Sequence, residues 1–200
     1  MKKLFAVMPV LLILVILLAT GASAAYTPEV DYAQQMINAA VKGDYTAGYA
    51  AAQSRNEKID AMGLSYVKFS FDDLMSLSKI MQSEAGSSWL SDEWKMSVGE
   101  VLLNRVASPE YPNTIQECIN QKGQYTGTSS SYFLNLIPSE RCVNLAVRLL
   151  SGERHLHPSV VYQSNFKQGS GVYVSYYDKY LGWTYLCVSS KPDLYPAISA

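Results

Sequence analysis

The spacing of apolar positions predicts a chain that is mostly helical. A helical stripe of apolar residues follows Thr27-Pro28, and Gly43 ends it. Asp44 is a good N-cap for a second, alanine-rich helix that extends to Gly63. We therefore predict a helical hairpin over residues 26–63, whose thin apolar stripe packs against another part of the protein.

Three further helices and three short strands are expected after the hairpin. Ser70 with Asp73 marks one helix start, Ser91 marks the next, and Pro138-Ser139 opens the third. A loop rich in Gly, Ser and Tyr is expected over residues 121–132. The strands are expected at 160–162, 171–177 and 183–188. The predicted fold class is mainly α, an α+β chain with a few short strands.

Charge and composition narrow the class of partner. The net charge is -1, and no basic patch is available to neutralise nucleic-acid phosphates. Lys2 and Lys3 precede the apolar run 4–19, and Ala22-Ser23-Ala24 follows it, which predicts a secretory signal peptide over residues 1–24. The rival interpretation is an uncleaved anchor, but the run is short for a membrane span. We expect an extracytoplasmic, secreted or wall-located protein with no membrane contact after cleavage.

The chain divides into four segments on this interpretation. The signal peptide at 1–24 is followed by the hairpin and a linker over 25–69, a main domain over 70–190 and a loose tail over 191–200. We expect a monomer. The odd number of cysteines allows one disulfide plus one thiol, or three small buried side chains. These cysteines are Cys118, Cys142 and Cys187.

One carboxylate stands on an apolar helix face. In the helix that starts at Ser70, Glu84 falls beside Ile80 and Met81. One interpretation is a frayed helix end that reaches into water. The other is a buried acid, because apolar neighbours and the negative helix end both raise a carboxyl pKa. A glutamate of raised pKa is suited to protonate a glycosidic oxygen.

The next helix carries three more polar residues of interest. On its wheel Glu100 points away from the apolar side, which predicts a solvated surface charge. Arg105 falls on the apolar face and needs a partner, either Glu84 or a backbone carbonyl. Asn104 lies on the flank. We expect Asn104 and Arg105 to give structural support by bracing the helix that carries Glu84.

Several blocks of sequence resemble the SleB-type cell-wall hydrolases, which include the spore-cortex-lytic enzymes. The resemblance covers about residues 72–186. The stronger blocks are Ser78–Gly86 (S-K-I-M-Q-S-E-A-G), Ser97–Val106 (S-V-G-E-V-L-L-N-R-V), Tyr111–Ile115 and Gln121–Tyr125, and the weaker ones are Ala146–Gly152 and Val161–Asn165. The family implies a lysozyme-like helical domain that cleaves peptidoglycan between N-acetylmuramic acid and N-acetylglucosamine.

The resemblance also implies roles for single residues. Glu84 corresponds to the catalytic acid of the family's E-A motif, and members act largely as lytic transglycosylases. Such an enzyme needs one glutamate, because the muramic C6 hydroxyl attacks its own anomeric carbon. No cofactor and no metal are expected, and peptidoglycan glycan strands are the expected partner. The candidate substrate-binding residues are Gln124, Tyr125, Tyr162 and Asn165.

The chain departs from the family at three positions. Lys95 stands where relatives usually have Gln, Glu100 where they have a small residue, and Trp183 where they have His. Two alternatives remain open. His155 and His157 form an H-x-H pair that would suit a zinc-dependent amidase of the peptide stem, although the chain has no third histidine. A non-catalytic wall-binding protein would instead use aromatic rings such as Tyr132, Tyr173, Tyr176, Tyr177 and Trp183 to stack on sugars.

Overall fold

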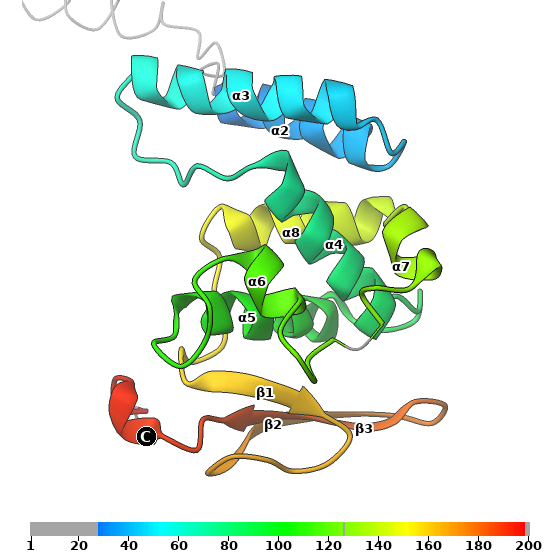
Figure 1. The fold of residues 1–200 in the computed structure, drawn as a ribbon, viewed down its shortest axis with the longest axis vertical. Helices are drawn as coiled ribbons and strands as arrows, with labels where there is room; N and C mark the ends of the chain where they lie inside the picture. The colour runs from blue at the N-terminus through cyan, green and yellow to red at the C-terminus, as the bar shows by residue number, and fades with distance from the viewer. Residues whose placement is uncertain (1–27, 126, 199–200) are drawn as a thin grey trace, which may run out of the picture.

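The computed structural model describes residues 28–125 and 127–198, so the predicted signal peptide lies outside the described residues. The helices are α2 (Pro28–Ala40), α3 (Tyr45–Ala61), α4 (Phe71–Ala85), α5 (Asp92–Ala107), α6 (Ile115–Ile119), α7 (Ser131–Asn135) and α8 (Glu140–Leu150), with a short 3-10 helix at Pro192–Leu194. The strands are β1 (Val160–Ser164), β2 (Gly171–Asp178) and β3 (Gly182–Val188). The helix-rich α+β class is confirmed (Figure 1).

The N-terminal hairpin packs on the rest of the protein, as its thin apolar stripe indicates. In Figure 1, α2 and α3 form a layer at one end of the molecule, next to α4 and α8. Gly48 of α3 permits the close approach, because a Cβ there would lie 2.3 Å from the Phe71 ring. Phe71 is the first residue of α4 and is fully buried. The hairpin therefore covers the start of the helix whose other end carries Glu84.

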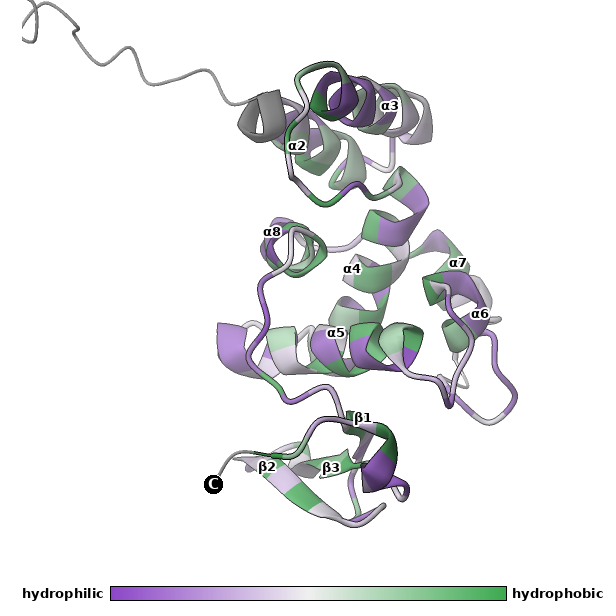
Figure 2. Ribbon diagram, turned by 90° about the vertical axis from the view of Figure 1, so that its left-hand side faces the viewer, coloured by the Kyte–Doolittle hydropathy of each residue, from purple (hydrophilic) through white to green (hydrophobic). Residues whose placement is uncertain are grey.

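Helix α5 is the centre of the fold. Figures 1 and 2 show it between α4 and α8 on one side and the sheet on the other. Gly99 allows this packing, since a Cβ there would lie 2.7 Å from Leu149 and 2.8 Å from Met81. An unbroken run from Trp94 to Arg105 is buried, so α5 has no solvent face along this stretch.

The burial of α5 overturns the expectation of a solvated Glu100. The side chain is 0% exposed. Its carboxylate accepts the backbone N–H of His155 at 2.8 Å and that of Leu156 at 2.8 Å. A helical wheel identifies the side opposite the strongest apolar stripe, and here the segment after α8 covers that side.

The three strands form one antiparallel sheet in the order β1-β3-β2. Val160 and Leu186 pack on Val101 of α5 and close the core on that side. Strand β1 is an edge strand, and it packs against α5. The three predicted strands are confirmed to within two residues at each end.

Some segments differ from the prediction or were left without one. The pattern gave no sign of α6 or α7, because helices of five residues have too few positions to show a period. The expectation of a loose tail over residues 191–200 is wrong for its first half, which contacts Glu110. The Tyr195 hydroxyl donates to Glu110 at 2.8 Å, and Lys191 forms an ion pair with Glu110 at 3.5 Å.

Two further observations concern the cysteines and the length and apolarity of the helices. Cys118, Cys142 and Cys187 are free, buried thiols. Within residues 28–125 and 127–198, no helix combines the length and apolarity that a membrane crossing requires.

Candidate active site

Glu84 lies in the last turn of α4, and the start of this helix is firmly set. Ser70 and Asp73 form a reciprocal capping box at its N-terminus. At the other end the Glu84 side chain opens into a hollow of about 370 Å³, here called the larger hollow. Its lining consists of Glu84, Arg105, Gly123, Gln124, Tyr125, Gln163, Phe166 and Gln168.

A smaller hollow of about 220 Å³ is also lined by Glu84. Its lining consists of Ser83, Glu84, Tyr125, Gly127, Thr128, Ser130, Tyr132 and Phe133. Glu84 and Tyr125 belong to both linings. The two hollows are therefore neighbours, and together they are here called the groove.

The two interpretations of Glu84 are reconciled by this position. The residue is exposed to the groove, yet protein surrounds its carboxyl on the other sides. This partial desolvation raises the pKa of Glu84, and the Arg105 charge lowers it by a smaller amount. Among the described residues that line the two hollows, Glu84 is the one with an acidic side chain. It is a solvent-exposed carboxyl whose pKa is raised by partial burial.

Arg105 and Asn104 brace β1 rather than the helix of Glu84. The Arg105 Nε donates to the Val161 carbonyl at 2.6 Å. The Asn104 amide donates to the carbonyls of His157 at 3.0 Å and Val160 at 3.1 Å. The predicted partner of Arg105 is thus the backbone carbonyl, which was one of the two options. Both residues fasten α5 to the strand that forms one wall of the groove.

The Arg105 guanidinium also forms part of the floor of the larger hollow. Its central carbon lies 5.4 Å from the centroid of the Tyr111 ring and 5.2 Å from that of Tyr125. Desolvation raises the pKa of Tyr125 to about 12, so its hydroxyl stays protonated and neutral near pH 7. Tyr125 has a φ of 44°, a left-handed backbone conformation that is uncommon outside glycine. The Tyr125 ring thus lies beside the Arg105 guanidinium, and the residue lines both hollows together with Glu84.

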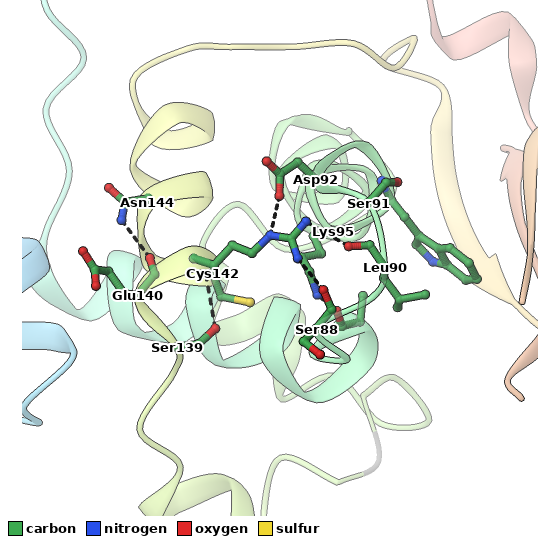
Figure 3. A network of polar contacts seen from close by, with 12 residues as sticks. Ser88, Leu90, Ser91, Asp92, Lys95, Ser139, Glu140, Cys142 and Asn144 are labelled. Atoms are coloured by element: carbon green, nitrogen blue, oxygen red, sulfur yellow. Dashed lines mark hydrogen bonds and ion pairs between the residues drawn. The ribbon is translucent and has the colours of Figure 1, made fainter.

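The turn after Glu84 is held by two cations. The ammonium of Lys95, only 1% exposed, donates to the carbonyls of Ala85 and Ser87, the latter at 2.7 Å. Arg141 donates to the carbonyls of Ser88 at 2.7 Å and Leu90 at 2.9 Å. Figure 3 shows Ser88 and Leu90 gathered at this point beside Lys95.

These contacts give a role to the position where relatives usually have Gln. Burial lowers the pKa of Lys95. The carbonyls at a helix C-terminus lack partners within the helix, and Lys95 supplies donors to them. Arg141 is further fixed by an ion pair with Asp92 at 2.6 Å. The backbone directly after Glu84 is therefore tied to both α5 and α8.

The predicted binding residues divide into two groups. Gln124 and Tyr125 line the larger hollow, as their motif suggests. Tyr162 and Asn165 are not among the lining residues. The Tyr162 hydroxyl lies 3.3 Å from Ser190 Oγ, and Asn165 is exposed beyond the end of β1.

Gln163, Phe166 and Gln168 line the larger hollow instead, although they were not predicted. Successive residues in a strand point to opposite sides of the sheet, so the motif over residues 161–165 does not say which of its residues face the groove. The prediction chose 162, and the groove lies on the side of 163. No signal in the sequence marked Phe166 or Gln168.

The H-x-H pair engages neighbouring side chains. The His155 ring lies 3.0 Å from Glu153, and His157 Nδ1 lies 2.7 Å from Ser159 Oγ. No group of three His, Cys, Asp or Glu side chains suited to a metal ion occurs in the described part of the chain. Trp183 stacks on Tyr185 at 5.7 Å on the sheet and lines neither hollow.

Comparison with protein families supports the resemblance seen in the sequence. Residues 91–179 match the model of the Cell Wall Hydrolase family, which confirms the resemblance to the SleB-type enzymes. The match begins after Glu84, so it covers Arg105 and the loop walls but not the carboxylate itself. Comparisons with curated proteins and with solved structures find no significant match.

Proposed function

We propose that this chain is a secreted lytic transglycosylase. The premise is that it carries a cell wall hydrolase domain, which acts on peptidoglycan. It cleaves glycan strands between N-acetylmuramic acid and N-acetylglucosamine. Glu84 is the general acid and then the general base. The proposal extends the coarser assignment, a peptidoglycan hydrolase with an extracytoplasmic role, to a reaction type and a catalytic residue.

The observation that carries the proposal is the place of Glu84 in the groove. Glu84 lines both the larger and the smaller hollow, so a polymer that occupied both would pass beside its side chain. Hydrolysis by two carboxylates needs a second acid across the bond. Within the described residues, neither lining offers one. Glu100, the nearest acid in the sequence among the earlier candidates, is buried and bound to the backbone of the segment after α8.

One carboxyl is sufficient for an intramolecular reaction. Protonated Glu84 donates its proton to the glycosidic oxygen, and the bond from that oxygen to the muramic C1 breaks. The resulting carboxylate accepts the proton of the muramic C6 hydroxyl as that oxygen attacks C1. The products are a new free hydroxyl on one fragment and a 1,6-anhydro end on the other, and no water is consumed. The intramolecular hydroxyl supplies the nucleophile that a second carboxylate would otherwise have to activate.

The test is mass spectrometry of fragments released from purified sacculi in isotopically labelled water. We expect anhydro ends without solvent oxygen. Glu84→Gln keeps the shape and removes the proton, so release should fall by about 10²- to 10⁴-fold while the fold survives. The matched control is Glu140→Gln, an exposed carboxylate at the start of α8, which should retain release.

Three results would contradict parts of the proposal. Reducing ends that carry labelled oxygen would show hydrolysis in place of transglycosylation. Full activity of Glu84→Gln would remove the catalytic assignment. Binding to sacculi without release of any fragment by the wild-type chain would favour the wall-binding alternative.

A further inference from the structure

The two hollows beside Glu84 differ in chemistry. The larger one is lined by the guanidinium of Arg105 and three side-chain amides, from Gln124, Gln163 and Gln168. The smaller one, apart from Glu84, offers hydroxyl groups and aromatic rings. Peptidoglycan has a matching asymmetry. Its glucosamine unit is neutral, whereas its muramic unit carries a lactyl group joined to a peptide that is rich in amides and carboxylates.

The hydrogen-bonding groups of the larger hollow are free for a ligand. Arg105 is 5% exposed, and its Nε is bound to Val161. Among the described residues, its two Nη atoms have no acceptor in hydrogen-bonding geometry, and the side chain lines the hollow. The Oε1 of Gln163 also lacks a partner within the described part of the chain, but it is buried, so the side chains of Gln124 and Gln168 are the amides offered to a ligand. A buried arginine held rigidly between two rings is ready to bind a carboxylate or a carbonyl.

The serine and threonine hydroxyl groups of the smaller hollow are already committed as donors. Ser83 donates to the Ile80 carbonyl at 3.1 Å, and Thr128 donates to that of Ile119 at 3.3 Å. Ser130 donates to the Gly127 carbonyl at 2.6 Å. These oxygens keep acceptor capacity for sugar hydroxyls. Tyr132, which is 66% exposed, adds a ring face for the apolar side of a sugar.

We propose that the groove binds the glycan in one direction, with the peptide-bearing muramic unit in the larger hollow and the glucosamine unit in the smaller one. The guanidinium of Arg105 and the amides of Gln124 and Gln168 recognise the lactyl-peptide arm. The proposal rests on the function proposed above and adds the polarity of the substrate and the residues that select it. It makes the enzyme specific for peptide-substituted strands rather than for β-1,4-linked glucosamine polymers in general.

Binding to the inactive Glu84→Gln chain tests this directly, by calorimetry with two tetrasaccharides. One is a glucosamine–muramic tetrasaccharide with its peptides, and the other is the N-acetylglucosamine tetramer. We expect the first to bind at least about tenfold more tightly, a difference of about 1.4 kcal/mol. Adding Gln124→Ala and Gln168→Ala should abolish most of that preference. The control, Tyr132→Ser, should weaken both ligands by a similar factor and leave the preference intact.

The outcomes separate this inference from the proposed function. Equal binding of both ligands by the parent overturns the inference, whatever the activity of the wild-type chain on sacculi. Loss of the preference in Tyr132→Ser, but not in the glutamine variant, reverses the polarity and also overturns it. If the double variant has a lower melting temperature, Gln168→Ala alone replaces it. Absence of release from sacculi by the wild-type chain, with the preference intact, would instead contradict only the proposed function.

Discussion

Replacement of Glu100 tests whether the buried centre of α5 is described correctly. A solvated surface glutamate can be changed to alanine at almost no cost, usually within about 0.5 kcal/mol. In the structure the carboxylate is fully buried and accepts the N–H groups of His155 and Leu156. We therefore expect Glu100→Ala to be clearly destabilising. The reason is the loss of the acceptor for two backbone donors next to α8.

The magnitude follows from those contacts. A buried donor left without an acceptor costs about 1–3 kcal/mol. His155 itself is exposed, so water can replace part of its lost contact, and the relief of burying a charge offsets a further part. A net loss of about 2–3 kcal/mol is expected. For a chain of this size it corresponds to a fall in melting temperature of about 4–12 °C.

Urea unfolding of the wild type, Glu100→Ala and a control gives the answer. The control is Glu57→Ala on α3, whose exposed carboxylate accepts a hydrogen bond from Gln53 one turn away. A loss for Glu100→Ala no larger than that of Glu57→Ala would refute the buried acceptor and restore the solvated interpretation.

Acidity adds a second check on the same residue. Burial raises the folded-state pKa of Glu100, and the two backbone hydrogen bonds lower it by less. The unfolded chain has an ordinary carboxyl pKa of about 4.3. The folded state therefore binds its proton more tightly, and the stability from this group declines as pH rises from that value through the raised pKa. Glu100→Gln cannot titrate, so its deficit relative to wild type should be larger in acid than at neutral pH.

Three further predictions concern the groove. The alkaline limb of the kcat/KM profile should lie above the ordinary carboxyl range, because the pKa of Glu84 is raised and the acid must be protonated; a limb at about 4 would contradict this. Arg105→Ala should lower the free energy of unfolding by about 2–4 kcal/mol, because the bond to the Val161 carbonyl is lost. It should also move the alkaline limb to higher pH, since the Arg105 charge lowers the pKa of Glu84. An unmoved limb would show that Arg105 does not affect the titration of Glu84. Lys95→Met should lower the free energy of unfolding by about 2 kcal/mol and should lower kcat by a larger factor than it raises KM, because the carbonyls of Ala85 and Ser87 lose their donor. An unchanged free energy of unfolding would refute the role of Lys95 in holding the turn after Glu84.

Most of the fold followed from local signals. The caps at Ser70, Ser91 and Ser139 and the alternation of the strands gave element bounds close to those observed. Glu84 was selected as a candidate because one acid broke the apolar stripe of a helix. Signals of this kind depend on residues within a few turns of each other, and the chain states them directly.

The errors share another physical cause. Whether the back of α5 meets water depends on the segment 153–158, which is distant in sequence and gives no local sign. The side of β1 that faces the groove depends on how the sheet docks, so Tyr162 was chosen where Gln163 lies in the hollow. The function of Lys95 could not be inferred either, because its partners at Ala85 and Ser87 belong to the preceding helix and turn.

The two walls of the groove differ in how they are fastened to the rest of the protein. On one side the backbone after Glu84 is tied by Lys95 and Arg141 to two helices. On the other side, the described residues of the loop 121–130 form local turns: the Thr128 N–H donates to the Tyr125 carbonyl at 3.0 Å, and the Thr128 hydroxyl donates to the Ile119 carbonyl at 3.3 Å. The wall that carries Glu84 is thus fastened to two helices, whereas the loop presents its lining residues on local turns. Under the proposed function, exchange of residues in that loop is expected to change the substrate range without moving Glu84.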